Sequence, residues 1–217
     1  MKEEALKTRS YNDVCGLAQA LDNVGERWAL LIVRELLFGP RRFTELRLSL
    51  EGISQNVLSQ RLRELQTASV VVSVKAASSA RAHAYELTPI GYSLEPTLTA
   101  LARWGMLTDP HEGTDLSASA FMLLLKVLYA PQQAAGQRVA QFDLDGETFT
   151  VTAGKQDVEI TRGHFRDASL TITASIRIAT DLLLEGLALS DAIASHRVQI
   201  HGDPEAAAAL LAQFGVQ

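Results

Sequence analysis

Hydrophobic residues in the first half of the chain recur every three to four positions, the spacing of amphipathic helices. The clearest case runs from Ile53 to Ala68, where Leu58, Leu62 and Leu65 form one apolar stripe. Ser54 precedes this stripe as a candidate N-cap, because its hydroxyl can accept a hydrogen bond from an N–H of the first turn. The pattern therefore predicts a helix that begins at Ser54 and buries its leucine side.

The same periodicity predicts three helices upstream, at 13–24, 27–38 and 43–49. We expect the first of them to turn Leu17, Ala18 and Leu21 inward. Glu51-Gly52 then supplies a tight turn before the helix at Ser54. A helix, a brief turn with glycine and a second helix form the helix-turn-helix layout.

Residues 70–75 and 81–87 are rich in β-branched or alternating residues, which predicts a β-hairpin, or wing, directly after that helix. Thr88-Pro89 then begins a helix expected to continue to about Leu107. Its apolar side is longer than a small domain needs, which predicts that it packs against its twin in a homodimer. The expected dimer residues are Leu94, Leu98, Leu101 and Trp104.

A polar, turn-forming segment at 109–114 is the expected linker, which gives a first domain at 1–108 and a second at 115–217. The second half predicts helices at 116–128, 175–185, 190–195 and 204–214, and strands at 139–144, 147–153, 157–161, 170–174 and 198–201. Because most helices follow the strands, we expect an α+β domain whose antiparallel sheet is covered by helices.

Composition sets broad limits on the 217-residue chain, which is 47% hydrophobic and 21% charged. Residues 1–11 are charged and lack the apolar core of a signal peptide, and we expect no membrane-spanning stretch. Cys15 is the only cysteine, which excludes an internal disulfide and makes a reducing cytoplasm the expected location.

Charge is unevenly distributed, although the whole chain carries −5. Residues 41–81 contain 7 basic and 3 acidic side chains, whereas residues 109–217 contain 7 basic and 14 acidic ones. An acidic protein with one basic segment can still bind a polyanion through that segment.

The polar face of the Ser54 helix holds amides, hydroxyls and a guanidinium, which suit the base edges of a major groove. The alternative is an ordinary solvated helix face. Arg41 and Arg42 before the helix, and Arg81 in the wing, are candidates for phosphate contacts. The expected DNA-binding residues are therefore Arg41, Arg42, Ser54, Gln55, Asn56, Ser59, Gln60, Arg63 and Arg81.

Several short segments follow one another in a characteristic order: Cys15 ahead of Ala20-Leu21, then Gly25–Trp28, Arg41–Leu46, Gly52–Ser54, Leu58–Leu65, Tyr85–Gly91 and Leu101–Gly105. Together they make residues 13–105 resemble the HxlR-type winged helix-turn-helix regulators. The resemblance implies a dimeric bacterial transcription factor that binds a palindromic operator in double-stranded DNA. The chain departs from the family at Ser69-Val70, where glycine-leucine is usual.

Three segments of the second half, Ala168–Thr173, Asp191–Ser195 and Val198–Pro204, resemble the sterol-carrier-protein-like fold. That resemblance implies an apolar tunnel for a fatty or steroid-like small molecule. The alternative is a solid core filled by the same side chains. The candidate pocket residues are Phe121, Leu124, Leu125, Leu128, Ile178, Leu182 and Leu183.

No catalytic or metal-binding constellation is visible, because the histidines are scattered at 83, 111, 164, 196 and 201. We expect no enzyme, cofactor or metal. Cys15 is either a redox sensor, as in some relatives of the HxlR type, or a small contact residue.

The sequence therefore predicts a cytoplasmic, dimeric DNA-binding transcriptional regulator whose second domain is a module for sensing a hydrophobic ligand or for assembly. The alternatives are a lipid-binding carrier or assembly protein whose winged helix mediates protein contacts, and a regulator whose second domain is purely structural. The basic segment 41–81 favours DNA over the carrier.

Overall fold

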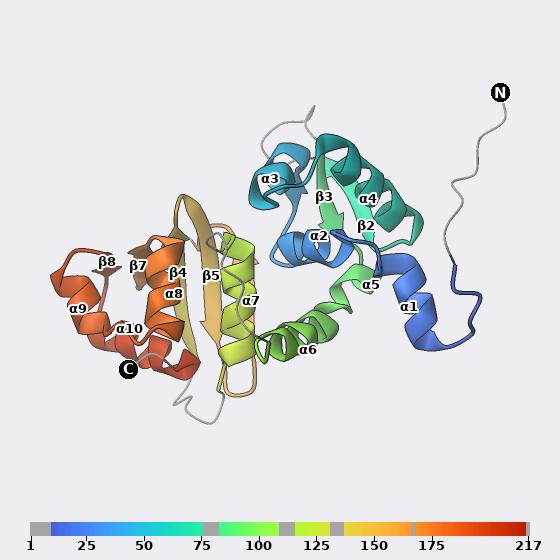
Figure 1. Cartoon of the computed structure of the whole chain (residues 1–217). Coiled ribbons are helices and arrows are strands. Elements are labelled where there is room, and N and C mark those ends of the chain that lie inside the picture. The colour runs from blue at the N-terminus through green and yellow to red at the C-terminus, as the bar shows by residue number, and fades with distance from the viewer. Residues whose placement is uncertain (1–9, 76–82, 109–115, 131–136, 166–167, 216–217) are drawn as a thin grey trace. The chain divides into compact units, whose positions relative to one another are not determined.

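A computed structural model of the chain describes residues 10–75, 83–108, 116–130, 137–165 and 168–215 (Figure 1). Its contacts divide the chain into two compact units, Met1–Glu95 and Pro96–Gln217. Each unit is described by itself. The domain limits expected from the sequence, 1–108, 109–114 and 115–217, stay a prediction, and the linker at 109–114 lies outside the described residues.

Four helices precede the wing in the first unit: α1 (Gly16–Val24), α2 (Ala29–Leu36), α3 (Phe43–Ser49) and α4 (Gln55–Thr67). The helices α3 and α4 confirm the predicted ones. The Ser54 hydroxyl accepts a hydrogen bond from the Val57 N–H at 3.3 Å, and all three predicted leucines of α4 are buried. The apolar stripe and its cap therefore fix where α4 begins and which side it buries.

The inward face predicted for α1 is wrong in part. Ala18 and Val24 are buried, but Leu17 is 68% and Leu21 is 40% exposed. The helix α1 contacts α4, and only its Ala18–Val24 side is covered. The spacing of apolar residues correctly predicts an apolar face on α1. It does not show that the rest of the unit covers only part of that face.

The wing hairpin belongs to a three-stranded sheet in the order β1-β3-β2, formed by β1 (Arg41–Arg42), β2 (Val71–Lys75) and β3 (His83–Leu87). The hairpin of β2 and β3 is confirmed, with Val71 opposite Leu87 and Lys75 opposite His83. The strand β1 was not predicted, because two residues are too few to show alternation. Arg41 and Arg42 pair with Tyr85 and Ala84, which ties the start of α3 to the wing.

The single long helix expected after Thr88 is wrong: the chain forms α5 (Pro89–Tyr92) and, after a break, α6 (Glu95–Gly105). Thr88 does cap α5, accepting from the Gly91 N–H at 3.1 Å. Proline explains the break, because Pro96 lacks the N–H that a continuous helix would donate to the Tyr92 carbonyl.

The second unit contains a five-stranded sheet in the order β6-β5-β4-β7-β8. Its strands are β4 (Arg138–Leu144), β5 (Glu147–Ala153), β6 (Val158–Arg162), β7 (Thr171–Ala174) and β8 (Val198–His201). Its helices, besides α6, are α7 (Ala118–Leu128), α8 (Ile176–Leu184), α9 (Leu189–Ala194) and α10 (Pro204–Leu211), followed by the 3-10 turn η2 (Ala212–Phe214).

The sheet is not purely antiparallel, which corrects the prediction. The strands β4 and β7 run parallel, with Phe142 opposite Ile172, whereas the other neighbouring pairs are antiparallel. The chain makes the β4–β5–β6 meander first and then returns on the free side of β4. The α+β class is confirmed.

The hairpin between β4 and β5 turns at Asp145 and Gly146, whose φ angles are 48° and 87°. This left-handed pair is what a two-residue hairpin turn requires, so the Asp-Gly signal placed the turn correctly. The turn sets Phe142 opposite Phe149, and both rings are buried. Helices α7 and α8 contact each other against the sheet (Figure 1), so the core of this unit lies between them and the strands.

Candidate nucleic-acid interface

The exposed face of α4 carries most of the residues predicted to read DNA. Ser54, Gln55, Asn56 and Arg63 are exposed, whereas Ser59 and Gln60 are half-buried. Helical spacing places Asn56, Ser59, Gln60 and Arg63 on the side of α4 opposite the buried leucines, whereas Ser54 is the N-cap and Gln55 lies beside that face. The arrangement presents hydroxyl, amide and guanidinium groups on a helix whose first turn is capped by Ser54.

An open groove of about 520 Å³ lies along this face. It is lined by Asn56, Val57, Ser59, Gln60, Arg61 and Arg63. Val57 and Arg61 were not among the residues predicted to bind DNA, because residue type and helix face alone do not show that they reach the groove. All of these lining residues except Val57 are polar or charged, which suits a polar and anionic partner.

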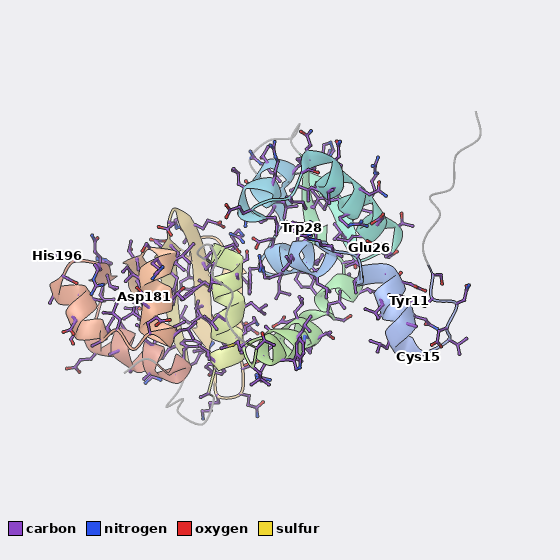
Figure 2. All side chains as sticks on the ribbon, in the orientation of Figure 1. Tyr11, Cys15, Glu26, Trp28, Asp181 and His196 are labelled. Atoms are coloured by element: carbon purple, nitrogen blue, oxygen red, sulfur yellow. The ribbon has the colours of Figure 1, made fainter. Side chains whose placement is uncertain are left out.

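A chain of hydrogen bonds orders three of these side chains. Gln60 Nε2 donates to Glu64 Oε1 at 2.7 Å, and Arg63 Nη2 donates to Gln60 Oε1 at 3.0 Å. Arg61 forms an ion pair with Glu64 and a second one, 3.2 Å long, with Glu26. Glu26 follows α1 and is labelled in Figure 2 at the end of α1 opposite Cys15. The i, i+3 and i, i+4 contacts were readable from spacing, but the link to Glu26 required the fold.

Arg41, which the sequence predicts to contact phosphate, lies inside the domain. Its side chain is buried, and its Nη1 donates to Oε2 of the fully buried Glu35 at 2.9 Å. Arg34 donates to the other Glu35 oxygen at 2.8 Å. A buried carboxylate must be paired, so this guanidinium is held inside the domain rather than offered to phosphate.

The other two arginines expected at phosphates differ from Arg41. Arg42 is half-buried at the start of α3, where its backbone N–H donates to Glu45 Oε2 at 2.7 Å. That bond satisfies one of the otherwise unpaired N–H groups of the helix start and leaves the guanidinium uninvolved in the cap. Arg81 lies outside the described residues. Phosphate contact by Arg42 and Arg81 stays a prediction.

The four predicted dimer residues divide into two groups. Leu98 is buried within the chain and Leu94 is half-buried, whereas Leu101 is 47% and Trp104 is 63% exposed. Leu98 is therefore a core residue rather than a surface one. The exposed pair lies one turn apart on α6, and Val14, Leu17 and Leu21 form a second exposed apolar strip on α1 and the residues before it.

Cys15 is exposed and occupies the N-cap position of α1. The backbone N–H groups of Leu17 and Ala18 lower the pKa of its thiol. This effect is not visible in the sequence, because the donors are main-chain groups whose direction is set by the helix start.

The predicted ligand pocket is almost filled by side chains. A cavity of about 10 Å³ lies between α7, α8, α10 and the sheet, and Phe121, Leu182 and Leu183 are among its lining residues. Leu124, Leu125, Leu128 and Ile178 do not line it. Pockets for small molecules usually enclose about 300–1,000 Å³. In the conformation described, this space is no larger than one water molecule, and its lining residues are all apolar.

Among the described residues, no group of three or more His, Cys, Asp or Glu side chains is placed to hold a metal ion. None of the helices in the described part of the chain has the length and apolar character needed to cross a bilayer.

A helix-turn-helix formed by α3 and α4, followed by the β2–β3 wing, defines a winged helix-turn-helix domain. Residues 23–112 match the model of the HxlR-like helix-turn-helix family. The chain is 37% identical over 86 residues to the HTH-type transcriptional regulator YvaP of Bacillus subtilis, covering 40% of this chain and 80% of that protein. The chain belongs to the HxlR-like helix-turn-helix family.

A second regulator of Bacillus subtilis, YkvN, is 37% identical over 92 residues, covering 42% of this chain and 77% of its own length. The HTH-type transcriptional regulator Rv3095 of Mycobacterium tuberculosis is 43% identical over 89 residues, or 41% of this chain. This chain spans 56% of the length of Rv3095. The three relatives are thus similar to the winged-helix part of this chain.

Proposed function

We propose that the protein is a transcriptional regulator that binds double-stranded DNA as a homodimer, with α4 in the major groove and the wing on the backbone. The observation that carries this proposal is the exposed polar groove of α4, capped by Ser54 and anchored by three buried leucines. Its relatives are named as HTH-type transcriptional regulators, which supports the same conclusion. Enzymatic activity is not part of the proposal.

Substitution of Asn56 gives the most direct first test, because this residue is exposed in the first turn of α4 and lines the groove. A recognition helix contacts base edges mainly through its N-terminal residues, and an asparagine can pair with adenine through two hydrogen bonds. We expect Asn56→Ala to weaken the preferred site by about 1–3 kcal/mol and to leave affinity for random DNA nearly unchanged.

Gln66→Ala is the matched control, since Gln66 is an exposed amide in the last turn of the same helix and does not line the groove. Sites are first selected with the unaltered protein from a genomic fragment library, and both variants are then measured on the selected duplex. Equal affinities for the two variants would remove α4 as the reading helix.

The dimer rests on the exposed apolar side chains of α6, because a contiguous apolar surface commonly marks an interface. Leu101 and Leu184 are both 47% exposed, one on α6 and one on α8. Leu101→Glu should therefore convert a dimer to a monomer in sedimentation at micromolar concentration, while Leu184→Glu should leave it dimeric. A monomeric unaltered protein would contradict the dimer.

The second unit is proposed to be a sterol-carrier-like α+β module attached to this regulator. The small volume of the cavity between α7, α8, α10 and the sheet favours a structural role over ligand sensing in the conformation described. A panel of fatty acids and steroids tested by thermal shift decides between the two. A rise in melting temperature together with altered operator binding would restore the sensing hypothesis, since a ligand acts only by preferring one state.

A further inference from the structure

We infer that Glu64 and Glu26 are positioning residues that make Gln60 a reader of adenine in the operator. The inference rests on the proposed function and adds to it the base read by one side chain and the groups that orient it. It starts from an unusual feature of the groove: two carboxylates stand beside a surface that is proposed to meet a polyanion, where their charge opposes binding.

The contacts of Gln60 allow only one orientation of its amide. A carboxylate can only accept a hydrogen bond and a guanidinium can only donate one. Since Glu64 Oε1 lies 2.7 Å from one end of the amide and Arg63 Nη2 lies 3.0 Å from the other, the first end must be the NH₂ group and the second the oxygen. A glutamine without these neighbours could present either end.

The fixed amide keeps one N–H and one oxygen lone pair for another partner. Adenine offers a complementary pair in the major groove, the N7 acceptor and the N6 amino donor, whereas guanine offers two acceptors. An amide locked with one free donor and one free acceptor therefore favours adenine. A freely rotating amide would lose rotational entropy on binding and would discriminate less between bases.

Arg61 holds Glu64 in the place that this arrangement needs. It binds the Oε2 oxygen of Glu64, so that Oε1 is left facing Gln60, and its second amino group pairs with Glu26 at 3.2 Å. Glu26 belongs to the segment between α1 and α2 and not to α4. A residue of the segment between α1 and α2 therefore helps to position the Gln60 side chain on α4.

Replacing Glu64 should have opposite effects on affinity for random DNA and on discrimination between bases. Glu64→Gln removes one negative charge from the interface, which should strengthen binding to random DNA. It also replaces an obligate acceptor by an amide that can donate or accept, so Gln60 is no longer fixed. Glu51→Gln is the matched control: Glu51 is exposed in the turn before α4, carries the same charge and lies outside this chain of contacts.

The experiment measures binding to a duplex selected by the unaltered protein from a random library, and to versions in which each A·T pair of the half-site is replaced by G·C. At one A·T position, we expect the unaltered protein and Glu51→Gln to bind the A·T duplex much more tightly than the G·C duplex. Gln60→Ala should show no such preference there, and the preference of Glu64→Gln should be about tenfold smaller than that of the unaltered protein. Glu26→Gln should lose less, about two- to threefold, because Arg61 still holds Glu64.

Thermal melting checks that each variant is folded, and Glu26→Gln, which leaves α4 unaltered, carries the test if Glu64→Gln does not fold. The inference is overturned if Glu64→Gln, or Glu26→Gln in its place, retains the discrimination of Glu51→Gln, or if Gln60→Ala costs no preference at any A·T position. Failure of the unaltered protein to select any duplex is a different result, because it would remove the proposed function itself.

Discussion

Replacing Arg41 should destabilise the first unit rather than weaken DNA binding directly. Arg41 Nη1 and Arg34 Nη2 bond the two oxygens of Glu35 at 2.9 and 2.8 Å, and the Glu35 side chain is completely buried. Breaking a buried ion pair from one side typically costs about 3–5 kcal/mol, because the remaining charge is left without compensation. Arg34 stays in place, so we expect about 3 kcal/mol for Arg41→Ala, the lower end of that range.

The assay is urea unfolding followed by tryptophan fluorescence in a Trp104→Phe background, where Trp28 is the remaining tryptophan and reports on the first unit. Arg47→Ala is the control, since Arg47 is an exposed arginine of α3 and should change stability by less than about 0.5 kcal/mol. The double variant Arg41→Met with Glu35→Leu should recover part of the loss, because it removes the fully buried carboxylate, while the Arg34 side chain is 19% exposed and can reach water.

A result of less than about 1 kcal/mol for Arg41→Ala would refute the reasoning about the buried pair. If the variant instead kept its stability and lowered the salt dependence of DNA binding by about one phosphate contact, the role expected from the sequence would be correct. A buried ion pair at Arg41 thus predicts a change in stability, whereas a phosphate contact predicts a change in the salt dependence of DNA binding.

Two further predictions concern Cys15 and the core of the second unit. The thiol pKa of Cys15 is lowered by backbone N–H groups, so iodoacetamide should react with the folded protein at a lower pH midpoint than with the urea-unfolded chain, and equal midpoints would contradict this. The same shift makes the thiolate favour folding above the unfolded-state pKa, a contribution that is lost as the pH falls through the folded-state pKa. Phe121→Ala should cost about 3–5 kcal/mol in the second unit, because Phe121 is 2% exposed in a nearly filled core, whereas Leu184→Ala at the surface should cost less than about 1 kcal/mol.

Local signals in the sequence predicted local structure well. The Ser54 cap, the leucines of α4 and the Asp145-Gly146 turn each need only neighbours within a few residues, and the structure confirms all three. The break before α6 could also have been predicted, since Pro96 has no N–H to donate within a helix. The apolar pattern around it favoured one continuous helix instead.

Features that depend on distant partners were missed or assigned wrongly. Arg41 looks like any surface arginine until α2 places Glu35 beside it, and Arg61 gains its second partner only when Glu26 reaches α4. The parallel pairing of β7 with β4 likewise follows from the path of the chain around the meander, which alternation within a strand does not record. Residue type and spacing thus identified the groove on α4, whereas the fold decides which arginines reach it.

The salt dependence of DNA binding by the unaltered full-length chain tests the central claim most directly. The protein is titrated onto its selected duplex and onto a scrambled duplex of equal length over a range of salt concentrations. We predict that log affinity falls linearly with log salt on both duplexes, since phosphate contacts release counterions, and that the selected duplex stays tighter throughout. Binding that is absent, or that is insensitive to salt and equal on the two duplexes, would contradict the account.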